Sequence, residues 1–177
     1  MCECRGPSGT NSVVQSLDEL EFERGLWCAA QYGDMDRALH LLDKGFQVDQ
    51  RDAAGYTALH YAARNGHLNV CRLLLDRGAC VDAVTWQGKA TPLHRAAAVG
   101  KFDVVEYLVK RRAKVGLKDA DGRTALHRAA INEHFDICDF LLKAEPQLKH
   151  QADIHNKTPV DYVQTTELLS LFNKEQE

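Results

Sequence analysis

The stretch "TALHYAARNGHLNVCRLLLDRGACVDA", residues 57–83, decides the fold of this chain. Leu59, Ala62 and Ala63 lie at i, i+3 and i+4, the spacing of one face of a helix. Gly66 ends that helix, and the apolar run that follows predicts a second helix. The second helix is apolar on more than one side, so neighbouring elements must cover it from two directions.

The motif that opens this stretch recurs along the chain at a nearly constant period. "TALH" begins at Thr57, "TPLH" at Thr91, "TALH" again at Thr124 and "TPVD" at Thr158, with spacings of 34, 33 and 34 residues. A step of 33 residues back from Thr57 reaches Arg24 in "RGLWCAAQYGD". This segment keeps the leucine, the alanine pair and the glycine of the repeat. Five copies of one unit therefore fill most of the chain.

The period and the T-P-L-H-x-A signature resemble the ankyrin-repeat family. The resemblance implies an all-α fold: an ankyrin-repeat solenoid of five stacked helix-turn-helix repeats with short β-hairpin-like fingers. We expect a disordered tail over residues 1–11 and a single domain over residues 12–177. That domain would consist of an N-terminal cap at 12–49, internal repeats at 50–148 and a C-terminal cap at 149–177.

Departures from the repeat pattern predict the two ends of the stack. Arg37 and His40 stand where the second repeat has Val70 and Leu73, which suits a terminal repeat without an outer neighbour. Before it, "SVVQSLDELEF" at residues 12–22 has the apolar spacing of a short helix laid over the first repeat. At the other end the last motif loses its histidine and the chain runs into a charged tail.

Histidines are the residues that first suggest chemistry, but their spacing favours packing. His60, His94 and His127 occupy the same position of successive repeats. Packed helices lie ~8–10 Å apart, whereas zinc ligands must all lie within ~2.0–2.3 Å of one ion. We therefore expect no metal and no cofactor, and we expect each histidine to bond the threonine of its own motif and nearby backbone. His67 and His134, which follow the turn between helices, suggest the same role.

The cysteines also favour packing over catalysis. Cys71 and Cys138 share a repeat position that Val105 fills in another copy, as expected of a small apolar core site. Cys2 and Cys4 form a C-x-C near the N-terminus; two thiols are too few for a structural zinc site, and zinc or lipidation there stays an alternative. The chain has no G-x-S-x-G, P-loop, H-E-x-x-H or C-x-x-C motif, so we expect no enzyme.

Composition limits the classes of partner. The 177 residues carry a net charge of −3, which gives no overall attraction to nucleic acid or to anionic membranes. No apolar run approaches the ~18 residues of a membrane helix, and the N-terminus has no signal-peptide pattern. We expect a monomer in the cytoplasm, with the nucleus as a second possible location. The basic run "KRRAK" at Lys110–Lys114 resembles a nuclear-localisation patch, although cations are also favoured at the end of a helix.

The candidate binding surface follows from the helix pattern. Because Leu59, Ala62 and Ala63 face inward, the residues at Tyr61 and Arg64 face outward. The resemblance implies that this stripe and the finger tips line a concave surface that grips a protein partner. The candidate partner-binding residues are Tyr32, Tyr56, Arg64, Asn65, Trp86, Val99, Arg123, Ile131 and Asn132. Ordinary surface scatter is the alternative for this stripe.

Trp86 has two possible roles of its own. It lies in the third finger, which is one residue longer than the fourth. It could contact a partner, or it could fold back onto the neighbouring finger.

Three function classes compete on this sequence. The leading one is a non-catalytic adaptor or scaffold that binds a protein of unknown identity. The second is a regulator like the ankyrin-type inhibitors of cyclin-dependent kinases, whose second repeat is typically irregular, whereas Thr57–Gly78 follows the family pattern. The third, an enzyme or metal protein, has no motif in its favour.

Overall fold

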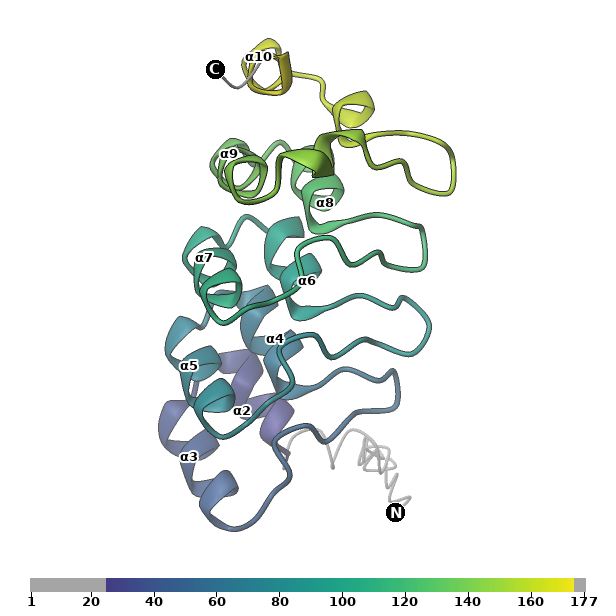
Figure 1. Ribbon diagram of the computed structural model, residues 1–177. Helices are drawn as coiled ribbons and strands as arrows, with labels where there is room; N and C mark the ends of the chain where they lie inside the picture. Colours follow the sequence, from purple (N-terminus) through teal and green to yellow (C-terminus); the bar gives the residue numbers. More distant parts are fainter. Residues whose placement is uncertain (1–24, 174–177) are drawn as a thin grey trace, which may run out of the picture.

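The computed structural model describes residues 25–173 and is built from paired helices (Figure 1). The first helices of the repeats are α2 (Leu26–Tyr32), α4 (Ala58–Asn65), α6 (Pro92–Ala98) and α8 (Ala125–Ile131). The second helices are α3 (Met35–Asp43), α5 (Leu68–Asp76), α7 (Phe102–Lys110) and α9 (Phe135–Ala144). The last repeat holds the 3₁₀ helices η1 (Pro146–His150) and η2 (Pro159–Tyr162), followed by α10 (Thr166–Asn173). No helix in this part of the chain is long and apolar enough to span a bilayer.

The helix pairs stack in sequence order into a solenoid. In Figure 1, α2, α4, α6 and α8 form an inner row beside the projecting fingers, and α3, α5, α7 and α9 form an outer row. Each inner helix contacts the next inner helix, and each outer helix contacts the next outer helix. The fifth repeat closes the stack through contacts between α8 and η2. The five-repeat solenoid predicted from the period is confirmed.

The core consists of the repeated leucine and alanine positions. Leu59, Leu93 and Leu126 are fully buried, and the alanine pairs beside them leave room for close helix contacts. Cys71 and Cys138 are also fully buried, and burial raises the pKa of each thiol to about 12. These two cysteines therefore fill a small apolar core position, as the repeat alignment predicted.

The fingers are hairpin turns without regular β-strands in the described residues. In the second, fourth and fifth fingers, the N–H of the first residue donates to the carbonyl oxygen of the fifth residue. The bonds run from Asp52 to Tyr56, from Asp119 to Arg123 and from Asp153 to Lys157. The third finger is closed from Thr85 to Ala90, which accommodates its extra residue. Neighbouring fingers are joined by single backbone bonds, such as Trp86 N–H to the Ala54 carbonyl at 3.3 Å. So few bonds per finger do not build a β-ladder.

The two ends of the stack differ from the interior. In the first repeat His40 is exposed and Arg37 is partly exposed, in keeping with a cap. The expected tail at residues 1–11 and the expected helix at residues 12–22 lie outside the described residues. At the C-terminal end, the fifth repeat replaces its first α-helix with the shorter η2, and α10 buries Leu168 and Phe172 against the stack.

One turn after an outer helix adopts a conformation that favours glycine. Gly78, after α5, has φ of 86°, and Arg112, at the same place after α7, has φ of 65°. Side chains with a Cβ are disfavoured in this left-handed region. Arg112 is therefore strained where its neighbouring repeat has glycine.

Candidate functional site

The motif histidines join each repeat to the next. His60 Nδ1 accepts the backbone N–H of Thr57 at 3.1 Å, so the proton of the neutral ring lies on Nε2. Nε2 lies 3.0 Å from the carbonyl oxygen of Ala90, in the following repeat. His94 and His127 repeat this arrangement, with Nε2 at 2.9 Å from the Arg123 carbonyl and 3.2 Å from the Lys157 carbonyl. The predicted bonds to the threonines are confirmed, and each ring also links two repeats.

Burial keeps these rings neutral. It lowers the pKa of His60 to about 4, and it lowers the pKa values of His94 and His127 in the same direction. Both nitrogens of each ring are occupied by hydrogen bonds. Among residues 25–173, no group of three or more His, Cys, Asp or Glu side chains is arranged to hold a metal ion.

His67 and His134 form a second set of links between repeats. His67 Nε2 lies 2.9 Å from the Gln31 carbonyl, and His134 Nε2 lies 3.4 Å from the Ala98 carbonyl. The His67 ring packs so closely on Gly33 that a Cβ there would lie 2.5 Å from Nδ1. These two histidines are packing residues, as predicted.

At the last repeat an aspartate takes the motif histidine's place. Asp161 accepts hydrogen bonds from the Thr158 N–H at 2.7 Å and the Thr158 hydroxyl at 2.8 Å. A carboxylate can cap the turn in this way but is too short to reach a further repeat. The substitution therefore fits the end of the stack.

The candidate binding residues lie on one side of the solenoid, which we call the inner surface: the exposed sides of α2, α4, α6 and α8 together with the fingers. Three of the candidates are exposed large apolar side chains: Tyr32 at 71%, Trp86 at 58% and Val99 at 44%. The polar members Arg64, Asn65 and Asn132 are also exposed. The half-buried members are Tyr56, Arg123 and Ile131.

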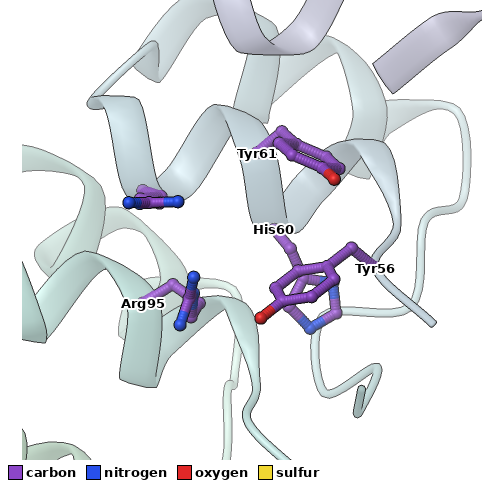
Figure 2. A pocket seen from close by; sticks show the side chains of 5 residues that line it. Tyr56, His60, Tyr61 and Arg95 are labelled. Carbon is purple, nitrogen blue, oxygen red and sulfur yellow. The ribbon is translucent and has the colours of Figure 1, made fainter. Parts of the chain in front are cut away.

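Two of these residues meet at a pocket between α4 and α6. Tyr56 and Arg64 line a cavity of about 170 Å³ together with His60, Tyr61 and Arg95 (Figure 2). The Arg95 guanidinium lies over the Tyr56 ring, 5.1 Å from its centroid. In Figure 2 the Tyr56 hydroxyl points toward Arg95. The pocket is therefore lined by cationic and aromatic side chains.

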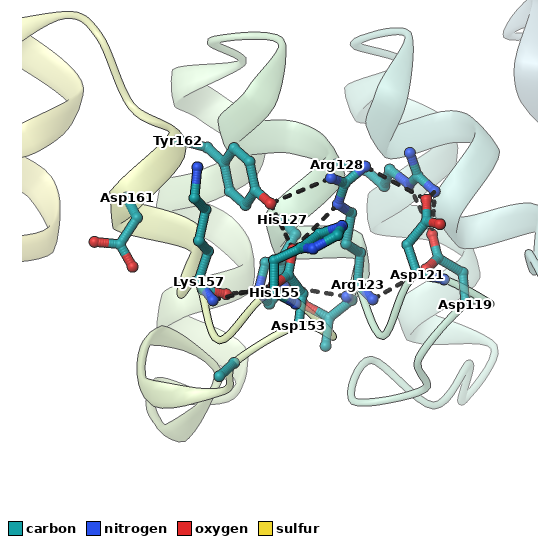
Figure 3. Close-up of polar contacts among 12 residues, drawn as sticks. Asp119, Asp121, Arg123, His127, Arg128, Asp153, His155, Lys157, Asp161 and Tyr162 are labelled. Carbon is teal, nitrogen blue, oxygen red and sulfur yellow. Dashed lines mark hydrogen bonds and ion pairs between the residues drawn. The ribbon is translucent and has the colours of Figure 1, made fainter.

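Arg123, by contrast, is engaged within the chain (Figure 3). Its Nη2 donates to the Tyr162 hydroxyl at 3.2 Å, and its Nε donates to Asp153 at 3.4 Å. Its guanidinium also lies over the Tyr162 ring, 5.2 Å from the centroid. These contacts join the fourth and fifth repeats, so Arg123 has a structural role that the sequence did not reveal.

Trp86 folds back onto the neighbouring finger, which is the second of the two roles considered from the sequence. Its ring packs against the second finger, where a Cβ on Gly55 would lie 2.7 Å from the Trp86 Cγ. Because the side chain is still 58% exposed, one side of the ring remains open to solvent. Trp86 therefore folds back onto its neighbour and also presents apolar surface.

A recurring side-chain pair joins the fingers to the inner helices. In three repeats the finger begins with an aspartate. The carboxylate of this aspartate accepts a hydrogen bond from the side chain that lies four residues after the threonine of the repeat motif. The pairs are Asp52 with the Tyr61 hydroxyl at 2.6 Å, Asp119 with Arg128 Nε at 2.7 Å and Asp153 with the Tyr162 hydroxyl at 2.5 Å. Figure 3 shows the second and third of these pairs.

The third repeat lacks this pair. Thr85 stands at the aspartate position, and Arg95 stands at the position of Arg128. Arg95 was not among the candidate residues, although the missing aspartate in the third finger is visible in the sequence. His60 and Tyr61 also line the pocket without having been candidate binding residues.

Comparison with known proteins is consistent with this architecture. A family model described as ankyrin repeats (3 copies) matches residues 9–85, 26–119 and 84–158. The human ankyrin repeat domain-containing protein 39 is 54% identical over 82 residues, which cover 46% of this chain and 45% of that protein. The Bos taurus protein of the same name is 55% identical over 64 residues, covering 36% of this chain and 35% of that protein.

A similarity to a protein named as an enzyme is confined to a small part of that enzyme. The Drosophila melanogaster palmitoyltransferase Hip14 is 39% identical over 94 residues, which are 53% of this chain but 15% of Hip14. The matched segments thus span less than half the length of each of these relatives.

Proposed function

This chain belongs to the ankyrin-repeat family, and we propose that it is a non-catalytic adaptor that binds a protein partner through its inner surface. Ankyrin repeats generally mediate protein–protein interactions. The observation that carries the proposal is the set of exposed apolar side chains Tyr32, Trp86 and Val99 on that one surface, with Arg64 among them. Aromatic residues and arginine are enriched in protein interfaces and dominate their binding energy.

We propose that the chain is non-catalytic because its buried histidines and cysteines, the side chains most often reactive in enzymes, serve the packing of the solenoid. The motif histidines are neutral and hydrogen-bonded at both ring nitrogens, so they have no lone pair or proton to offer a substrate. Cys71 and Cys138 are buried, and their raised pKa values keep them as thiols. These groups stabilise the solenoid.

The kinase-inhibitor alternative has less support. The ankyrin-type inhibitors typically have an irregular second repeat, whereas here α4 is a continuous helix of eight residues that begins with a capping box at Thr57 and His60. We therefore keep a general adaptor as the proposed function, with the cytoplasm as the proposed location.

The proposal is tested by comparing two double variants in affinity capture from cell extract. Trp86→Ala with Arg64→Ala removes two exposed inner-surface side chains. Arg72→Ala with Asp76→Ala removes two exposed side chains of the outer helix α5. We expect the inner pair to weaken binding of the main captured protein at least ~100-fold, which corresponds to ~2.7 kcal/mol.

The outer pair is the matched control and should leave the captured protein unchanged. Melting curves of both variants check that the solenoid is intact, because Trp86 also packs on the second finger. Capture lost with the outer pair and kept with the inner pair would place the partner on the opposite surface and refute the proposal.

A further inference from the structure

The third repeat holds an arginine without the carboxylate that its equivalent has. In the fourth repeat, Asp119 accepts hydrogen bonds from both Nε and Nη2 of Arg128. Arg95 occupies the equivalent position, but Thr85 replaces the aspartate, and its hydroxyl is used within the finger to accept the Ala90 N–H at 3.1 Å. The finger therefore supplies no anion to Arg95.

Arg95 has no replacement partner elsewhere among the described residues. Its Nε is the one buried side-chain nitrogen or oxygen in residues 25–173 without a hydrogen-bond partner. A buried donor without an acceptor costs free energy, and proteins rarely leave one unless another molecule supplies the acceptor. The contact that the guanidinium does make, with the face of the Tyr56 ring, orients it without satisfying its N–H groups.

The surroundings of Arg95 favour an anion. Arg64, a second cation, lines the same pocket and forms no ion pair with any residue between 25 and 173. The lining contains no carboxylate. The Tyr61 hydroxyl donates a hydrogen bond to the carboxylate of Asp52. Burial and this hydrogen bond raise the pKa of Tyr61, so its hydroxyl keeps its proton and adds no negative charge to the pocket. Two cations therefore share a pocket in which no carboxylate is among the lining residues.

The size of the pocket limits what it can hold. Its volume of about 170 Å³ is below the ~300–1,000 Å³ of typical small-molecule sites. One side chain of a longer ligand fits this space better than a whole metabolite does. The exposed Val99 follows Arg95 by four residues, and the exposed Trp86 packs on Gly55, which precedes Tyr56 in the chain.

We propose that this pocket binds the carboxylate of an aspartate or glutamate side chain of the protein partner, with Arg95 as its main ligand and Arg64 as the second cation. The proposal rests on the proposed function, because the occupant belongs to a partner that lies along the inner surface. The fourth repeat provides the model for the contact, since Arg128 holds a carboxylate through its Nε and Nη2. Arginine is suited to such two-point binding of carboxylates.

The test is a titration of the full chain with blocked peptides, followed by NMR of the arginine Nε–H signals. The probe is acetyl-hexaglutamate amide, and acetyl-hexaglutamine amide is its uncharged control. We expect the glutamate peptide to shift the Arg95 signal and the glutamine peptide to leave it in place. Arg95→Gln should weaken glutamate-peptide binding about tenfold, as expected for the loss of hydrogen bonds to a charged group.

Arg72→Gln is the matched control, because it also removes one positive charge but lies on α5. It should leave the affinity within about twofold of the unmodified chain, since an exposed charge at that distance is screened by salt. Equal losses for Arg95→Gln and Arg72→Gln would mean that the peptide responds only to net charge, which would overturn the proposal.

A second variant fills the pocket from within the chain. Thr85→Asp restores the aspartate that the other fingers have, and it can still accept the Ala90 N–H. We expect it to pair with Arg95 and to weaken binding of the glutamate peptide as strongly as Arg95→Gln does. If Thr85→Asp does not fold, the comparison of Arg95→Gln with Arg72→Gln decides the question alone.

Two further outcomes would count against the assignment. Unchanged binding by a folded Thr85→Asp variant would place the peptide elsewhere on the chain. Tighter binding of a blocked phosphoserine peptide through Arg95 would assign the pocket to phosphate instead of carboxylate. Because these titrations use synthetic peptides, their failure leaves the capture experiment on Trp86 and Arg64 as an independent test of the proposed function.

Discussion

Acidification should weaken the fold through the buried motif histidines, and His60 allows the effect to be calculated. In the folded chain burial lowers the pKa of His60 to about 4, from an ordinary value of 6.5. Between these two pH values the unfolded chain binds a proton that the folded chain does not. The contribution of His60 to stability is therefore complete above pH 6.5 and is lost as the pH falls toward 4.

The size of the loss follows from the two pKa values. Between pH 7 and pH 5, protonation of the unfolded chain at this one residue should lower the free energy of unfolding by about 2 kcal/mol. His94 and His127 act in the same direction, because burial lowers their pKa values too. The whole protein should therefore lose more than His60 alone accounts for.

Urea denaturation followed by circular dichroism at pH 7 and pH 5 measures this loss. His60→Gln should reduce stability at pH 7 by about 1–3 kcal/mol, because the shorter amide cannot accept the Thr57 N–H and donate to the Ala90 carbonyl at the same time. It should also reduce the difference between the two pH values by about 2 kcal/mol. His150→Gln, at an exposed position, is the control and should keep the full difference. A His60→Gln variant with the same pH dependence as the unmodified chain would refute the proposed role of the ring.

Two further predictions concern the stack itself. Leu93→Ala should lower the free energy of unfolding by ~2–5 kcal/mol and by more than Leu26→Ala, because α6 packs between α4 and α8; equal or reversed losses in urea denaturation would contradict this order. Arg112→Gly should raise the melting temperature, with a gain of about 1 kcal/mol, because it relieves the left-handed φ of 65°; a lower melting temperature would show that the Arg112 side chain stabilises the turn by more than its strain.

The sequence predicts the fold well because the repeat is a local pattern. The position of His60 three residues after Thr57 is enough to predict the bond between them. The bond from His60 to the Ala90 carbonyl depends on how two repeats stack, and the spacing of residues within one repeat does not specify it. The core role of Cys71 was predictable because Val105 fills the same position in another copy.

The candidate site was predicted less completely, for the same reason. Exposed positions such as Val99 follow from helix periodicity. Whether an outward-facing side chain is available to a partner depends on contacts across repeats. Arg123 is engaged by Tyr162 of the next repeat, a contact between residues that are 39 positions apart. Arg95 is recognised only when the pair of finger aspartate and inner-helix side chain is compared across the repeats. In the third repeat Thr85 replaces the aspartate, and Arg95 is left without the carboxylate that its equivalent Arg128 binds.

The central claim is that the inner surface of the solenoid binds a protein, and hydrogen exchange tests it most directly. The measurement compares backbone exchange in the chain alone and in the complex with its captured partner. The account predicts slower exchange in the finger tips and in α4, α6 and α8, with the strongest protection around Trp86 and Arg95. Protection confined to the outer helices α5, α7 and α9, with unchanged exchange in the fingers, would contradict it.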